Sequence, residues 1–188
     1  MRRADRIVEE YLVISAQMGN RDALERLVAL RGPRLLAHAS RLMGNKEEAR
    51  DVLQDAWIDI IRGLPKLADP RAFPAWATRI MTRRCSKAIR NNVRSRELKR
   101  EFGATAEHIS VYDDDWSADA AAVRRAIACL PAAQNAAIAL FYLEEMSVAE
   151  VSVALDIPVG TVKTRLMHAR EKLKATLTDA GETDDQAR

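Results

Sequence analysis

The sequence has few aromatic residues, no long apolar run and no apolar N-terminal leader. Aromatic residues make up 5% of its 188 positions. No stretch of about 18 apolar residues exists that could span a bilayer. Residues 1–10 also lack the apolar centre of a secretory signal peptide. We therefore expect no membrane insertion and a cytoplasmic location.

Cysteine and histidine are too sparse to build a disulfide scaffold or a metal site. Cys85 and Cys129 have no CxxC partner, and the three histidines form no ligand pattern. We interpret both cysteines as reduced structural thiols. No nucleophile or acid–base pair stands out either, so we expect no catalysis, no cofactor and no bound metal.

Charge is abundant and unevenly distributed. Residues 71–100 hold ten basic residues and one acidic residue, whereas 101–119 hold six acidic residues and no basic one. Residues 159–174 return to five basic residues against one acidic residue. Two cationic blocks separated by an acidic spacer indicate an extended polyanion that is contacted at two places.

Apolar residues recur at intervals of three and four along most of the chain, and no strand pattern or internal repeat is present. The predicted fold is all-α, with two small helical domains joined by a flexible linker. The predicted limits are 1–96 for the first domain, 97–117 for the linker, 118–178 for the second domain and 179–188 for a disordered tail.

The first two predicted helices occupy residues 4–18 and a stretch that begins near residue 21. The first is expected to bury Ile7, Val8, Tyr11 and Leu12 on its apolar side. The second contains Gly32-Pro33, which leaves open whether it is one kinked helix or two helices.

The third predicted helix, over 47–62, has a continuous apolar stripe and an acidic opposite face. An acidic helix face is commonly just solvated, and that reading stays open. An exposed isoleucine among the acids indicates a partner surface instead. The residues of this face are Asp51, Gln54, Asp55 and Ile58.

The fourth predicted helix, over 73–93, carries a row of cations along one side. Such a row without local acids repels itself, which costs stability unless an anion neutralises it. We therefore interpret the row as a nucleic-acid surface. Its members are Arg79, Arg83, Lys87, Arg90 and Arg94.

Residues 147–174 predict two helices joined by a tight corner. Ser147 and Glu150 form a capping box at the start, and Asp156-Ile-Pro158 ends the first helix. A short helix, a brief turn and a basic second helix are typical of a helix-turn-helix, whose second helix suits the DNA major groove. The alternative is a helical hairpin with a solvated basic face. The outward residues are Lys163, Thr164, Arg165, Met167, His168 and Arg170.

Three blocks of sequence resemble parts of a known protein family. They are EARDVLQDAWI at 48–58, FPAWATRI at 73–80, and Leu130-Pro131 leading into IPVGTVKTRL at 157–166. In these blocks, their order and their separations the chain resembles a bacterial RNA polymerase sigma factor of the extracytoplasmic-function (ECF) type, the small two-domain class of the sigma-70 family. The resemblance covers roughly residues 5–177. It implies core RNA polymerase and promoter DNA as partners, and an anti-sigma factor around which the linker lets the two domains close.

The resemblance also implies a role for each surface. The acidic face would dock on the clamp helices of the polymerase's largest subunit. The second domain would read the −35 element, with Lys163, Thr164, Met167 and His168 at base edges and Arg165 and Arg170 on phosphates. The block around Trp76 would melt and read the −10 element. The −10 candidates are Trp76, Arg79, Arg83, Arg84, Lys87 and Arg90.

Two positions depart from the family pattern. Arg83 stands where many members have Asn in the flipped-base region, and Phe141 stands where an Arg often precedes Tyr-Leu. The departures concern base preference and one phosphate contact. The alternative function is a helix-turn-helix regulator that dimerises through residues 1–96 and binds DNA without polymerase. An enzyme is a distant third, because no active site is recognisable.

Overall fold

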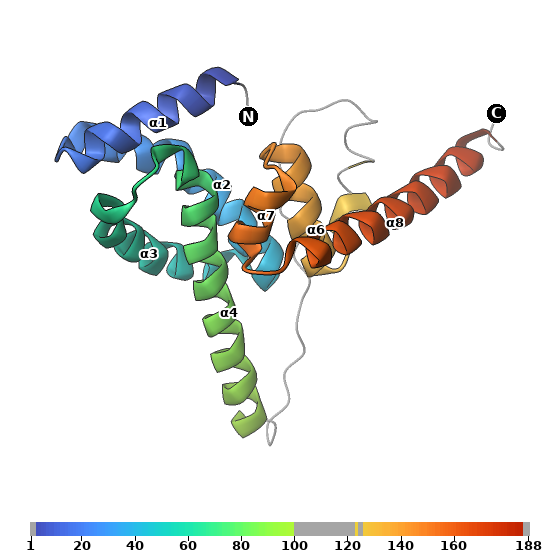
Figure 1. Ribbon diagram of the computed structural model, residues 1–188. Helices are drawn as coiled ribbons and strands as arrows, with labels where there is room; N and C mark the ends of the chain where they lie inside the picture. The colour runs from blue at the N-terminus through green and yellow to red at the C-terminus, as the bar shows by residue number, and fades with distance from the viewer. Residues whose placement is uncertain (1–2, 100–122, 124–125, 186–188) are drawn as a thin grey trace.

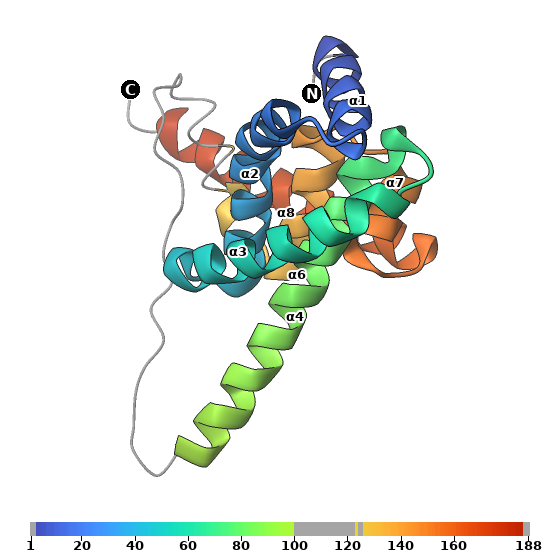
Figure 2. The same ribbon diagram turned by 90° about the vertical axis from the view of Figure 1, so that its left-hand side faces the viewer.

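The computed structural model describes residues 3–99, 123 and 126–185 (Figures 1 and 2). Every regular element in these ranges is helical, which confirms the predicted all-α class. The first group comprises α1 (Arg3–Gln17), α2 (Arg21–Met43), α3 (Lys46–Gly63), the 3-10 turns η1 (Leu64–Lys66) and η2 (Pro70–Ala72), and α4 (Phe73–Lys99). The second comprises α6 (Ala132–Ile138), the π-helical turn η3 (Ala139–Leu143), α7 (Val148–Leu155) and α8 (Val159–Asp185).

Each group has its own apolar core. The first core gathers side chains from α1 to α4, among them Leu27, Ile60 and Met81, all with 0% exposure. The second gathers side chains from α6 to α8, among them Val151 and Val162. Burying such a side chain contributes about 1.5–3 kcal/mol, so each group supplies its own driving force for folding.

Helix α1 turns a different face inward from the one predicted. Ile7, Val8 and Tyr11 are exposed by 62%, 45% and 63%, whereas Glu9 is buried. Leu12 is buried as predicted. The apolar pattern was misleading because one polar contact decides the rotation of the helix. Glu9 binds a buried arginine of α2, and turning Glu9 inward places the three apolar residues outside.

The structure answers one open question and extends two of the predicted helices. Helix α2 passes through Pro33 without a break, because buried residues on both sides, Arg31 and Leu35, hold it in place. Helix α4 continues to Lys99, into the first three residues of the predicted linker. Helix α8 continues to Asp185, into the stretch predicted to be disordered, carried by its own backbone hydrogen bonds beyond its last core residue. Residues 100–117 of the linker lie outside the described ranges.

The two groups are in direct contact. Helix α7 lies against α4 (Figures 1 and 2). Leu42 of α2 packs against both apolar cores. The lower half of α4 and the end of α8 project away from this body. No helix in the described part of the chain combines the length and apolarity needed to cross a membrane.

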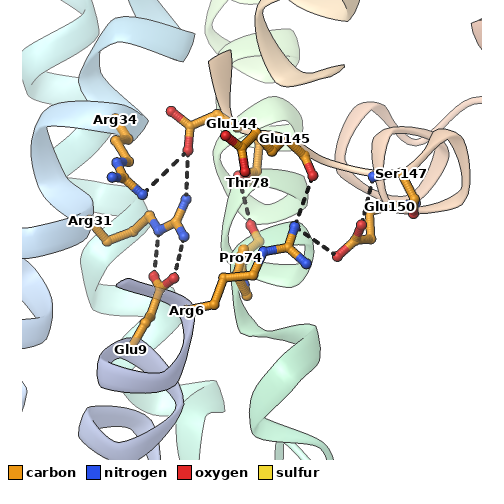
Figure 3. A network of polar contacts seen from close by, with 10 residues as sticks. All are labelled: Arg6, Glu9, Arg31, Arg34, Pro74, Thr78, Glu144, Glu145, Ser147 and Glu150. Carbon is orange, nitrogen blue, oxygen red and sulfur yellow. Dashed lines mark hydrogen bonds and ion pairs between the residues drawn. The ribbon is translucent and has the colours of Figure 1, made fainter. Parts of the chain in front are cut away.

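A polar network joins the first group to the segment that precedes α7 (Figure 3). Arg31 is 1% exposed, and its Nε donates to Glu9 Oε1 at 2.6 Å while Nη1 donates to Glu144 Oε2 at 3.2 Å. Nearby, Arg6 Nη2 donates to the carbonyl oxygen of Glu145 at 3.0 Å. A buried guanidinium is tolerated only when it is paired. Glu144 thus supplies an acceptor to the Arg31 guanidinium in addition to the Glu9 carboxylate of α1.

His38 of α2 is buried beside α4, where its Nε2 lies 2.9 Å from Thr82 Oγ1. With Nε2–H donating to that oxygen, the Thr82 hydroxyl proton is free to bond the carbonyl of Ala154 in α7, 2.7 Å away. Burial, and secondarily the charge of Arg41, lowers the pKa of His38 from 6.5 to about 3. The ring is therefore neutral at physiological pH.

This predicts a loss of stability on mild acidification. Between pH 6.5 and 3 the unfolded chain binds a proton at His38 that the folded chain does not, so the free energy of unfolding falls as pH falls. From pH 7 to pH 5 the loss from this group should be about 2 kcal/mol. Urea unfolding at several pH values measures it. His38→Gln should flatten the profile, whereas His168→Gln, at an exposed position, should not. An unchanged slope in the His38 variant would contradict the prediction.

Candidate nucleic-acid and partner surfaces

The four residues predicted on the acidic face do lie together on one side of α3. Asp51, Gln54, Asp55 and Ile58 are all exposed, at helical spacings of three, four and seven. The opposite side, including Trp57, is buried in the first core. Ile58 is 46% exposed on this side of the helix. An apolar residue surrounded by carboxylates is suited to a mixed apolar and basic partner.

Arg84 belongs to the edge of this acidic face and not to the cationic row of α4. Its Nε donates to Asp59 Oδ2 at 2.6 Å, and its Nη1 lies 3.5 Å from Asp55 Oδ2. One residue along a helix is a rotation of about 100°, which turns Arg84 away from Arg83 and toward α3. The structure therefore separates Arg84 from the other −10 candidates.

The remaining cations of α4 lie along one side of the helix. Arg83, Lys87 and Arg90 are exposed, and Arg79 is partly buried. Two of them already have a partner from the second group. Asp156 receives Arg79 Nη2 at 2.7 Å through Oδ1 and Arg83 Nε at 3.0 Å through Oδ2. The side chain of Arg94 lies outside the described ones.

Asp156 was recognised in the sequence only as part of a helix stop. It adopts the left-handed conformation, φ 56° and ψ 45°, directly after α7, a conformation that Asp tolerates better than most residues. Its N–H lies within bonding distance of the Val153 carbonyl, and the Ile157 N–H bonds the Ser152 carbonyl, as in a Schellman cap. Hydrogen bonds from Arg83 and Arg79 lower the pKa of its carboxyl group. No sequence signal linked this residue to α4, because the contact spans more than 70 positions.

Trp76 is half-buried at the start of α4, against the first core. Its ring lies 6.1 Å from that of Phe73, centroid to centroid. The backbone of Gly63, at the end of α3, lies under the indole: a Cβ at that position would be 2.8 Å from Trp76 Cζ2. A side chain at position 63 would therefore displace the indole, so glycine is required there for Trp76 to keep its place beside the cationic row.

Helix α8 presents the predicted recognition residues as one exposed surface. Lys163, Thr164, Met167 and His168 are exposed, whereas Arg165 is half-buried on another side of the helix. The capping box at the start of α7 is present as predicted: Ser147 N–H donates to Glu150 Oε2 at 2.7 Å and Glu150 N–H to Ser147 Oγ at 3.2 Å. The two helices and the corner between them form the predicted helix-turn-helix.

Two aromatic residues of η3 hold Arg170. Its Nε donates to the hydroxyl of Tyr142 at 2.9 Å, and its guanidinium carbon lies 5.9 Å from the ring centroid of Phe141 and 5.8 Å from that of Tyr142. Stacking on aromatic rings leaves part of a guanidinium fork free for a phosphate. Phe141, a departure from the family pattern, therefore holds Arg170 through a contact between its ring and the guanidinium.

The described residues contain no group of three or more His, Cys, Asp or Glu that could hold a metal ion. Cys85 is buried, and burial raises the pKa of its thiol to about 12, so it stays protonated and unreactive. Cys129 is exposed.

Comparison with known proteins agrees with this arrangement. The family model of sigma-70 region 2 matches residues 27–95, and that of sigma-70 region 4 matches residues 120–173. The ECF RNA polymerase sigma factor SigW of Bacillus subtilis (strain 168) is 31% identical over 173 residues, which span 86% of this chain and 92% of SigW. The chain belongs to the ECF sigma factors of the sigma-70 family. It is a factor that directs transcription initiation and, as a member of this family, not an enzyme.

Two solved structures share the fold. The sigma factor RpoE in complex with the anti-sigma factor NepR, from Bartonella quintana, has a TM-score of 0.68 at 24% identity, covering 82% of this chain and 96% of that one. CnrH in complex with the cytosolic domain of CnrY has a TM-score of 0.58 at 28% identity, covering 92% of this chain and 98% of that one. The predicted family and the two-domain helical fold are therefore confirmed.

The contact between Gly63 and Trp76 generates a prediction. Gly63→Ala should force the indole out of place and lower the free energy of unfolding by about 1–3 kcal/mol. Gly160→Ala is the matched control, because a Cβ there meets nothing within 4 Å. Alanine favours the helix over glycine, so this control should stabilise by up to about 1 kcal/mol. Chemical denaturation compares the two, and equal effects would show that Trp76 does not rest on Gly63.

Proposed function

We propose that this chain binds core RNA polymerase through α3 and contacts promoter DNA at two separate places, the −10 element through α4 and the −35 element through α8. The first domain, over residues 1–96, holds the polymerase and −10 surfaces. The second, over residues 118–178, holds the −35 surface, and residues 97–117 connect them. The observation that carries the proposal is the presence of one acidic and two separate basic surfaces on one chain.

The acidic face of α3 is the proposed polymerase surface. Its carboxylates provide electrostatic steering, and the exposed Ile58 provides apolar area that a purely solvated face would not need. Asp51 is exposed and forms no ion pair with the described residues. Asp55, by contrast, is already near the guanidinium of Arg84.

The cationic side of α4 is the proposed −10 surface. Arg79, Arg83, Lys87 and Arg90 hold the DNA backbone there, and the half-buried Trp76 supplies an aromatic face beside the point where a strand would separate. Arg84 contributes through its ion pairs with α3, by fixing α3 against α4. We assign it a structural role in place of the DNA contact first predicted.

The exposed face of α8 is the proposed −35 surface. Lys163, Thr164, Met167 and His168 lie where the second helix of a helix-turn-helix reaches base edges. Arg170, held by Phe141 and Tyr142, is placed for a phosphate. Arg165, on its separate flank, is placed for a phosphate on the other side of the groove.

Control by an anti-sigma factor is part of the proposal, as is a cytoplasmic location. The supporting observation is that the similar structures of RpoE and CnrH were solved in complex with an anti-sigma factor and with a cytosolic domain of CnrY, respectively. Run-off transcription with purified core polymerase tests the main function. Promoter-dependent transcripts should form only when this chain is added. If core polymerase ignores the chain while DNA is still bound, the alternative of a dimeric DNA-binding regulator replaces our proposal.

Charge reversal on α3 tests the polymerase surface. Asp51→Lys should weaken binding to core polymerase at least about tenfold, because it places like charges opposite each other in the complex. Glu25→Lys changes the net charge equally at an exposed position of α2 and should have little effect. Co-purification or a fluorescence titration with core polymerase measures both variants. Unaltered binding of the Asp51 variant would show that α3 does not dock there.

A further inference from the structure

The contact between α7 and α4 uses the same residues that are proposed to bind the −10 element. Arg79 and Arg83 both point at one carboxylate, that of Asp156, at 2.7 and 3.0 Å. Between these residues on α4, Thr82 lies under α7, with its Oγ1 2.7 Å from the carbonyl oxygen of Ala154. We call these five residues the α4–α7 interface.

The second domain is attached at both ends of α7. Before the helix, Glu144 pairs with the buried Arg31 and with Arg34 (Figure 3). In the first turn of the helix, Glu150 lies 3.6 Å from Arg6. After the helix, Asp156 pairs with Arg79 and Arg83. Five contacts at two separated places define one orientation of the second domain on the first.

In this orientation the two DNA surfaces are too close to act together. The names of the −10 and −35 elements place them about 25 base pairs apart, which is about 85 Å of B-form duplex at 34 Å per ten base pairs. His168 lies only twelve residues beyond Asp156, and a helix of that length spans about 18 Å. Because Asp156 touches Arg79 directly, one duplex cannot contact both surfaces at their proper spacing.

We propose that the second domain is a cover for the first domain's DNA surface, in which the Asp156 carboxylate occupies the position of a DNA phosphate on Arg79 and Arg83. The free chain is then closed at α4 while the recognition face of α8 stays exposed. This rests on the −10 role proposed above for the two arginines.

The chemistry at the Asp156 end of α7 suits a cover that can be removed. The carboxylate is 39% exposed, and the side chains of Arg79 and Arg83 are 40% and 60% exposed. Ion pairs at this exposure are screened by solvent and exchange readily. A DNA backbone presents many phosphates, which compete with the single carboxylate for the two arginines. In the proposed complex polymerase binds α3 and not α7, so α7 can still move away from α4. Separation of the domains therefore exposes the −10 surface at the moment when it is needed.

Asp156→Asn tests the cover with little change to the fold. Asn tolerates the left-handed backbone at this position, so the end of α7 is preserved. The matched control is Asp69→Asn in the first domain, which removes the same charge and also releases an arginine, Arg71. Asp69 caps η2 through its side chain, and Asn caps equally well.

Two measurements on the full-length chain are compared: the radius of gyration from solution X-ray scattering, and the affinity for a fluorescein-labelled single-stranded DNA 12-mer of mixed sequence. Asp156→Asn should show a larger radius of gyration and bind the oligonucleotide about three- to tenfold more tightly than wild type, since the competent open fraction rises. Asp69→Asn should change the radius not at all and the affinity much less. If the two variants behave alike in both measurements, the cover is overturned.

A second variant separates failure of the cover from failure of the proposed function. Arg79→Gln/Arg83→Gln should abolish promoter-dependent run-off transcription. Normal transcription by this double variant would overturn the −10 role of the two arginines, and the cover with it. Lost transcription combined with an Asp156→Asn variant that matches its control would leave the proposed function standing and overturn the cover alone.

Discussion

The structure depends first on a buried charge. Arg31 lies in the middle of α2 with 1% of its surface exposed, and a guanidinium in that position must be surrounded by acceptors. Glu9 of α1 supplies two of them and Glu144 of the second domain a third. Removing one partner of such a buried pair typically costs about 3–5 kcal/mol, although a complete pair stabilises far less. One arginine therefore orients α1, fixes its exposed face and receives the second domain.

Helix α4 combines three tasks that compete for its surface. One side carries Met81 and Cys85 into the first core, a second carries Arg84 to the carboxylates of α3, and a third carries the cationic row. A helix that is fixed on two sides by packing and ion pairs presents its third side rigidly. That rigidity suits strand separation, which requires groups held in place before the DNA arrives. It also makes the cationic row a ready docking site for any carboxylate that approaches, including one from the same chain.

The second domain shows how a local motif acquires a role from its position. The capping box, the corner at Asp156 to Pro158 and the exposed face of α8 follow from local residue types, and the helix-turn-helix was predicted from them. The C-terminal cap of α7, formed by Asp156, was not predicted. An Asp in the left-handed conformation, where Gly is usual, keeps a carboxylate at the corner. The use of that carboxylate is visible only beside α4.

The sequence by itself determined the main helices, the capping box of α7, the family and the composition of each surface, because these follow from local residue patterns. The acidic face of α3 and the exposed face of α8 are arranged as predicted, while their binding roles stay predictions. Tertiary structure decided the rotation of α1, the pairing of Arg84 with the carboxylates of α3, the support of Trp76 by Gly63 and the pairing of Asp156 with Arg79 and Arg83. Each of these joins residues far apart in the chain. Periodicity shows which residues share a face of a helix, but it does not show which other element packs against that face. Burial and charge pairing depend on that other element, so only the tertiary structure decides them.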